Sequence, residues 1–334
     1  EFISSPKKSL WKLSVPMMLG MSVQAIYMLI DTAFIGNWVG FKALTGLGFV
    51  FPPMFIIMGI TFGIGSGATT VIAQNIGKDD KKKADNAAEH LLVLGIVLSI
   101  FFILIGYFLG SNILKFQGAT GQSLVYASSY FFIMLIGIPF MIFSIFFRSI
   151  LSGEGDNMLP MKILGLGTII NIVLDPILIY YYQIEGAAIA TVISQCTVFF
   201  LFIYIILIKE TSFISFNLKK FKWDRKILSS ILKIGLPVGF SMLIMAIGIF
   251  FYNSILSKSL HPDSAIAAYT TAHRIEHLFF IPLISIATSM VTLIGMFYGA
   301  KKFNLIKIII IYCIKSCLLI SLLYGLIFYF LADQ

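Results

Sequence analysis

Residues 165–180 read GLGTIINIVLDPILIY, an apolar stretch that contains Asn171 and, one helical turn later, Asp175 followed by Pro176. A carboxylate at the centre of a membrane-spanning helix costs about 2.5–3.5 kcal/mol on insertion scales, and such residues usually serve a function. If this segment crosses a bilayer, Asp175 therefore marks a functional site. The composition of the whole chain shows whether that condition holds.

The composition is typical of a membrane protein. Of the 334 residues, 59% are hydrophobic and 12% are charged, against about 45–50% and about 25% in soluble domains. A helix needs roughly 20 apolar residues to cross the hydrocarbon core, and nine runs meet this length, at 13–36, 44–76, 88–110, 123–147, 158–182, 186–208, 230–257, 265–297 and 304–331. The sequence therefore predicts an all-α, polytopic membrane protein with nine transmembrane helices.

The basic residues predict the orientation of these helices. The N-terminus, the loops 77–90, 148–162 and 209–233, and the loop after the eighth span would lie on one side, and they hold 19 of the 24 Lys and Arg. The opposite loops hold only Lys42, Lys115 and Lys258. Because cytoplasmic loops are enriched in Lys and Arg, we expect a multi-pass protein of the inner or plasma membrane with a cytoplasmic N-terminus. The net charge of +9 then reflects topology, and we expect no nucleic-acid partner.

The sequence contains an internal repeat. LSVPMMLGMS at 13–22 aligns with IGLPVGFSML at 234–243, which superimposes Pro16 on Pro237, and ATTVIAQNIG ending at Gly77 aligns with MVTLIGMFYG ending at Gly299. The two offsets, 221 and 222, agree to within one residue. Six spans per copy place both copies in the same orientation, related by an axis along the membrane normal.

The repeat predicts the domain organisation. We expect an N-terminal six-helix lobe at 1–208, a cytoplasmic linker at 209–229, and the first three helices of a second lobe at 230–334. A complete second copy would extend beyond residue 334. We therefore expect nine helices of a twelve-helix, two-lobe (6+6, parallel-repeat) architecture.

Polar residues within the spans are the candidate functional residues. Gly20, Gln24, Tyr27 and Asp31 share one face of the first span, because residues three and four apart are neighbours on a helix. Asn171 and Asp175 share a face of the fifth span, and Pro176 leaves the carbonyl of Ile172 without its helical donor. Asp31, Asn171 and Asp175 form a candidate cation-coupling site, and the sixth span offers Thr191, Ser194 and Gln195 as further polar residues. The alternative is that these side chains only hydrogen-bond neighbouring helices together.

The eighth span contributes Arg274 and Glu276. These two residues could form a structural ion pair or contact a substrate, and the residues alone leave both possibilities open. With Gln24 and Tyr27, they are the candidates for lining a substrate cavity.

Several classes of chemistry are disfavoured. GIGSG at 63–67 lies within a predicted span and follows no strand, so it does not indicate a nucleotide-binding loop. There is no nucleophile elbow or zinc signature, and the three cysteines and four histidines do not predict a redox or metal site. We therefore expect no enzyme activity, no cofactor and no metal site, apart from a possible Na+ ion at Asp31, Asn171 and Asp175.

Three stretches together resemble the multidrug and toxic compound extrusion (MATE) family, in its DinF-like branch. They are PMMLGMSVQAIYMLIDTAFIG, FRSILSGEGDNMLPMKILGLGTIINIVLDPILIY and AAYTTAHRIEHLFFIPLISIATSMVTLIGMFYGAKK. The resemblance implies a twelve-helix antiporter that exports organic, often cationic, compounds in exchange for H+ or Na+. It also implies an N-lobe cation site at Asp31, Asn171, Asp175 and Thr191. The last three helices of the family's pattern have no counterpart in the chain.

Alternative functions remain open. One is a lipid-linked oligosaccharide flippase of the same superfamily, which would need a strongly cationic cavity. Others are an intramembrane enzyme with Asp31 and Asp175 as an acid pair, a noncatalytic scaffold, or a non-functional transporter fragment. We expect a monomer that interacts with small organic substrates and the lipid bilayer. The identity of the substrate and the choice between H+ and Na+ are not predicted.

Overall fold

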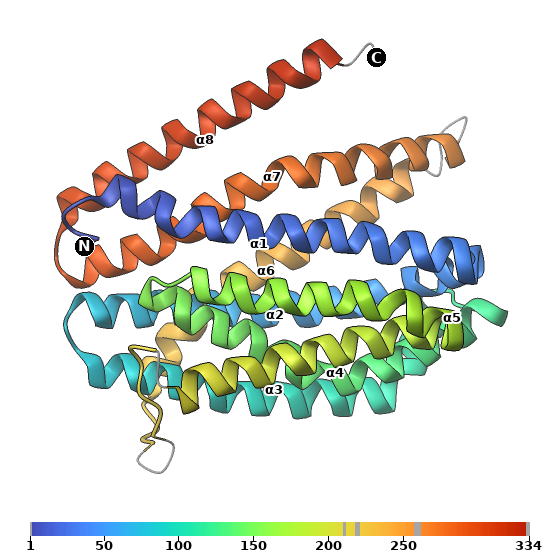
Figure 1. Ribbon diagram of the computed structural model, residues 1–334, viewed down its shortest axis with the longest axis horizontal. Coiled ribbons are helices and arrows are strands. Elements are labelled where there is room, and N and C mark those ends of the chain that lie inside the picture. Colours follow the sequence, from blue (N-terminus) through green and yellow to red (C-terminus); the bar gives the residue numbers. More distant parts are fainter. Residues whose placement is uncertain (1, 210–211, 218–220, 257–261, 332–334) are drawn as a thin grey trace.

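The structure is a computed structural model that describes residues 2–209, 212–217, 221–256 and 262–331. All regular elements in these ranges are helices (Figure 1). Their bounds are α1 Pro6–Phe34, η1 Ile35–Val39, α2 Phe41–Gly77, α3 Lys81–Phe116, α4 Gly121–Glu154, α5 Met158–Ile203, η2 Tyr204–Ile208, α6 Arg225–Leu256, α7 Pro262–Gly299 and α8 Phe303–Leu331. The prediction of an all-α protein is confirmed for this part of the chain.

Seven helices within the described residues are long and apolar enough to cross a membrane. They comprise α2 to α8, with α5 and η2 forming one continuous stretch. The predicted span at 13–36 is helical, in α1 and η1, but it is not among the seven. Both the count of nine spans and the six-plus-six layout stay predictions.

The long helix α5 consists of two helical arms that pack against each other. The chain turns at Gln183, which has a φ of 54° and a ψ of −131°, a left-handed conformation that is rare outside glycine. Gly186, three residues later, lies against the backbone of Leu178, and Gly167 of the first arm lies against Val198 of the second. The turn falls between the predicted spans 158–182 and 186–208.

Two loops predicted from hydropathy are shorter than expected. The segments 77–90 and 148–162 were predicted as loops, but α3 begins at Lys81 and α4 continues to Glu154. The first turns of α3 are polar and charged, so hydropathy alone does not reveal them. Asp80 caps α3 by accepting a hydrogen bond from the Lys83 amide, and its side-chain hydrogen bond with Lys83 lowers the pKa of the Asp80 carboxyl. The helix therefore extends two turns beyond the predicted span.

The packing of α1, α2, α6 and α7 follows the internal repeat. The repeat pairs α1 with α6 and α2 with α7, and the structure packs α1 on α7 and α2 on α6. Gly77 of α2 lies against Met296 of α7, and Gly299 of α7 lies against Gln74 of α2. Because both contacts exchange under an offset of 222 residues, the two copies meet across a local two-fold relation. The predicted domain boundaries are not tested by this packing, although α6 begins at Arg225, inside the predicted linker.

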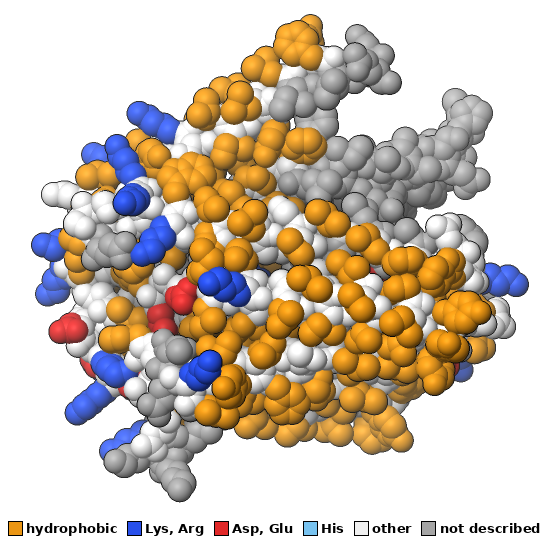
Figure 2. Space-filling model, in the orientation of Figure 1, with side chains coloured by type: hydrophobic (Ala, Val, Ile, Leu, Met, Phe, Trp, Pro, Cys, Tyr) orange, Lys and Arg blue, Asp and Glu red, His pale blue; other side chains and the backbone are white. Residues whose placement is uncertain are grey.

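The surface is apolar around the middle of the helices and basic at one end. In Figure 2, Lys and Arg side chains gather mainly at the end that carries the α2–α3 turn and the linker, and hydrophobic side chains predominate over the middle of the described surface. Exposed hydrophobic residues also lie along α8, for example Leu318, Leu322 and Phe330. Figure 1 shows α8 diverging from the other helices toward its C-terminal end, although the ring of Tyr324 still lies 4.6 Å from that of Phe279 of α7. This distribution suits helices surrounded by lipid.

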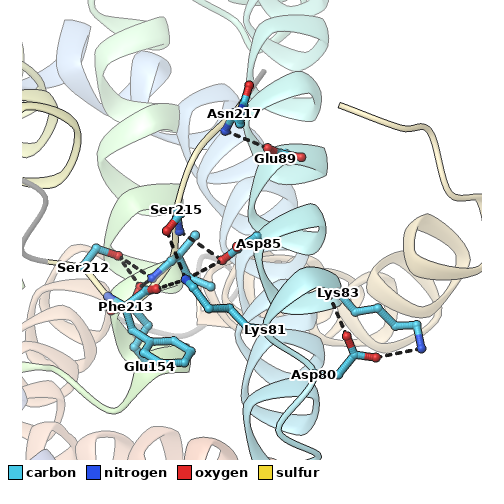
Figure 3. Close-up of polar contacts among 11 residues, drawn as sticks. Asp80, Lys81, Lys83, Asp85, Glu89, Glu154, Ser212, Phe213, Ser215 and Asn217 are labelled. Carbon is cyan, nitrogen blue, oxygen red and sulfur yellow. Dashed lines mark hydrogen bonds and ion pairs between the residues drawn. The ribbon is translucent and has the colours of Figure 1, made fainter. Parts of the chain in front are cut away.

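The linker between α5 and α6 is held against the basic end of the first lobe (Figure 3). Three acids accept hydrogen bonds from its backbone amides. Glu154 accepts from Phe213 at 3.0 Å and from Ile214 at 3.1 Å, Asp85 accepts from Ser215 at 3.0 Å, and Glu89 accepts from Asn217 at 2.9 Å. Lys81 also donates to the Phe213 carbonyl and to Ser215 Oγ. The linker is therefore docked on α3 and α4.

Candidate functional site

The side chains of Asn171 and Asp175, on the apolar helix α5, are both buried inside the helical bundle. Asp175 has no exposed surface, and Asn171 is 3% exposed. They lie four residues apart on α5, so they share a face of the helix, and Asn171 Nδ2 donates a hydrogen bond to Asp175 Oδ1 at 3.3 Å. The i, i+4 pair predicted from the sequence is therefore formed inside the bundle.

Asp31 of α1 joins this pair from a neighbouring helix. Helix α1 packs along α5, and Gly20 of α1 lies against Met161 of α5 at ordinary van der Waals distance. The half-buried Asp31 carboxyl lies close enough to Asp175 for the two groups to interact electrostatically. The structure thus brings together two acids that are 144 residues apart in the sequence.

Tyr130 of α4 connects the two acids to Thr191. Its hydroxyl is hydrogen-bonded to Thr191 and lies within electrostatic range of both Asp31 and Asp175. The Thr191 hydroxyl already donates to the Ala187 carbonyl at 3.0 Å, so Tyr130 is the donor to Thr191. Four side chains from α1, α4 and both arms of α5 therefore surround one point.

The site offers oxygen atoms in need of a partner. Asp31 Oδ1, Asn171 Oδ1 and Asp175 Oδ2 are buried and have no hydrogen-bond partner among the described residues. Buried acceptors are normally satisfied, and two enclosed carboxylates repel each other when both are ionised. A proton or a hard cation, which prefers oxygen ligands, would relieve both deficits. Within the described residues, no cluster of three or more His, Cys, Asp or Glu could hold a metal ion.

Of the other predicted site residues, Gln24 alone has a side chain among the described residues. Gln24 is exposed. Tyr27 lies in α1 and Arg274 and Glu276 in α7, but the side chains of all three lie outside the described residues. Their assignment to a substrate cavity stays a prediction.

Sequence reasoning missed Tyr130 and misplaced Arg148. Tyr130 is one of 14 tyrosines and lies in an apolar span without a helix-face pattern, so residue type gave no signal for it. Arg148 was counted as a loop residue, but it lies within α4, with its guanidinium over the ring of Phe62 at 5.9 Å from the ring centroid. Hydropathy assigns a basic residue at the predicted end of a span to the following loop, because it does not show that the helix continues.

A family model agrees with this architecture. The family described as MatE matches residues 16–177 and 237–334, which together are more than half of the chain. The two matched blocks begin at Pro16 and Pro237, the prolines that the internal repeat superimposes. A solved structure of the outward-facing conformation of a multidrug resistance MATE family transporter is similar, with a TM-score of 0.94 and 33% identity. That similarity covers 98% of this chain and 73% of the solved chain.

Two bacterial relatives are also similar. The probable multidrug resistance protein YpnP of Bacillus subtilis is 27% identical over 87% of this chain. The multidrug export protein MepA of Staphylococcus aureus is 28% identical over 88% of it. The chain spans 65% of the length of each of these relatives.

Proposed function

The chain belongs to the MatE family, and from this premise we propose that it acts in secondary active antiport, exporting organic, often cationic, compounds in exchange for H+ or Na+. Family membership makes it a multi-pass membrane protein of a transporter family, and its relatives are named for multidrug resistance and export. The observation that carries the coupling part of the proposal is the enclosed pair Asp31 and Asp175, with its unpartnered oxygens.

The coupling cation binds between α1 and α5 in this proposal. Asp31 and Asp175 supply the negative charge, while Asn171 supplies a further oxygen. Tyr130 fixes the Thr191 hydroxyl beside them. Cation binding removes the repulsion between the two carboxylates. The free energy of an ion gradient then shifts the equilibrium between conformations of these helices. Moving one charge through 100 mV is worth about 2.3 kcal/mol.

The remaining parts of the proposal concern partners and location. The substrates are small organic compounds, the protein is a monomer in the cell membrane, and its N-terminus is cytoplasmic. Figure 2 supports this orientation, because the basic side chains gather mainly at the end that carries the α2–α3 turn and the linker. The names of the relatives above favour drug export over the flippase alternative.

The test is gradient-driven efflux of ethidium by cells that express the gene encoding this chain. Asp31→Asn and Asp175→Asn should each abolish efflux under an imposed pH or Na+ gradient, at expression equal to wild type. Asp79→Asn is the matched control, because Asp79 is exposed in the α2–α3 turn and Asn tolerates its φ of 60°. This variant should retain wild-type efflux.

The outcomes separate coupling from folding. Wild-type rates in both site variants would contradict the coupling role. Equal loss of folded protein in both would indicate that the acids only hold the helices together. Failure of the wild type to move ethidium and other cationic dyes under either gradient would contradict export itself.

A further inference from the structure

A small cavity lined by several polar residues lies between the two repeat copies, away from the acid cluster. It is lined by residues of α1, α2 and α4 from the first copy and by Thr288 and Val291 of α7 from the second. It has about 20 Å³ of space for the centres of water-sized molecules, and one water needs about 10–15 Å³ on this measure. The cavity therefore admits one particle of roughly the size of water or of a monatomic ion.

Arg148 brings an uncompensated positive charge to this cavity. It lies six residues before the end of α4, which is about 9 Å along the helix. Its guanidinium packs over Phe62 but makes no ion pair or hydrogen bond with a described residue. The nearest acid along α4, Glu154, is bound to the linker amides. A charge inside a protein is normally paired, so Arg148 lacks the expected partner.

Ser66 is the second hydrogen-bond donor without an acceptor. Its hydroxyl lines the same cavity and forms no hydrogen bond with the described residues. The other hydroxyls of the wall have already used their protons. Thr69 donates to Ser149 O at 2.8 Å, Ser149 to Ile145 O at 2.9 Å, Ser152 to Asn157 Oδ1 at 2.6 Å, and Thr288 to Ile284 O at 2.8 Å.

From this arrangement we propose that the cavity binds one chloride-sized monovalent anion, held by the Arg148 guanidinium and the Ser66 hydroxyl. A charged donor and a neutral donor that face one small space are complementary to an anion. A water molecule would fill the space but leave the charge uncompensated. Phosphate and organic acids are too large for the volume.

The anion site depends on contact between the two copies. Three of its walls come from the first copy and the fourth from α7, so separation of α7 from α2 and α4 would remove one wall of the site. The bound anion therefore stabilises the arrangement in which the copies are packed at this end.

The experiment measures thermal unfolding of the purified chain in detergent, in NaCl and in sodium gluconate at equal ionic strength. Chloride should raise the melting temperature of the wild type in a saturable manner, as expected for a ligand of the folded state. Arg148→Gln should abolish this rise. Ser66→Ala should increase the half-saturating chloride concentration roughly two- to tenfold, the effect of losing one hydrogen bond.

Controls distinguish a site from a general salt effect. Arg225→Gln removes an arginine at the start of α6, outside the cavity, and should keep the full chloride response. If Arg148→Gln does not fold, Ser66→Ala decides the question, because an unchanged half-saturating concentration would overturn the proposal. Absence of a chloride effect in the wild type, or an equal effect in wild type and Arg148→Gln, would also overturn it.

Discussion

The docked linker permits a quantitative prediction for Glu89→Ala. Asp85 and Glu89 lie four residues apart on α3, which separates them by about 6 Å along the helix. They accept hydrogen bonds from the amides of Ser215 and Asn217, which are two residues apart and so about 6.6 Å apart in an extended chain. The distance between the two acids on one face of α3 thus matches the distance between alternate amides of the linker (Figure 3).

The magnitude follows from the lost hydrogen bond. Hydrogen bonds to charged groups contribute about 1.5–3 kcal/mol. Glu89 is 6% exposed, but Asn217 is exposed, so water replaces the carboxylate at the amide and the lower end of the range applies. A loss of about 1.5 kcal/mol corresponds to roughly a tenfold increase in local opening.

Amide hydrogen exchange measures this opening directly. Exchange of a peptide covering 212–217 should be roughly tenfold faster in Glu89→Ala than in wild type, while exchange in the apolar part of α3 stays unchanged. Glu185→Ala, which removes an exposed acid from α5, should leave linker exchange unaltered. Linker exchange within twofold of wild type in Glu89→Ala would refute the view that this carboxylate holds the linker.

Three other predictions address the interface, the candidate cation site and the orientation. Gly77→Ala should lower the free energy of unfolding by about 1–3 kcal/mol, because the added methyl group would overlap the Met296 carbonyl. Gly165→Ala, which faces open space, should be neutral or slightly stabilising in the same thermal unfolding assay. Tyr130→Phe removes the donor to Thr191, so it should cost about 1 kcal/mol of stability and shift the half-saturating concentration of the coupling cation in efflux assays; an unshifted value would exclude Tyr130 from the site. Lys82→Cys should react with a membrane-impermeant thiol reagent only after cells are opened, and labelling of intact cells would reverse the proposed orientation.

Much of the fold could be predicted because apolar length and helix formation go together in a membrane protein. The turn at Gln183 fell between two predicted spans, and the repeated segments of the sequence became helices that pack as equivalent pairs. The polar start of α3 and the last turns of α4 were missed. Hydropathy detects the lipid-facing part of a helix, whereas these turns are stabilised by capping at Asp80 and by hydrogen bonds to the linker.

The candidate site was predictable to the extent that its residues are costly in a membrane. Asp31 and Asp175 stand out in apolar segments, and the structure brings them together. Tyr130 is not an unusual residue in such a segment, so its residue type did not mark it as a site residue. The linker contacts are formed by backbone amides, which every residue except proline carries, so side-chain patterns could not reveal them. The acids Asp85 and Glu89 can be read from the sequence, but the linker amides that donate to them cannot be inferred from it.

The two repeat copies differ at the position of Asp31, because the second copy has no acid there. At offsets of 221 and 222 residues, the positions that correspond to Asp31 hold Tyr252 and Asn253, so the second copy repeats the packing without the acid. In the proposed antiport, cation binding at Asp31 would act on the first copy, and its effect would have to reach the second through helix contacts. Helix α1 provides such a contact, because Ser285 Oγ of α7, which donates to the Ile281 carbonyl, also lies 3.5 Å from Met21 Sδ. Met21 is ten residues, or about 15 Å, from Asp31. A displacement of α1 on cation binding would thus move the surface on which α7 packs, so one element joins the candidate cation site to the interface between the copies.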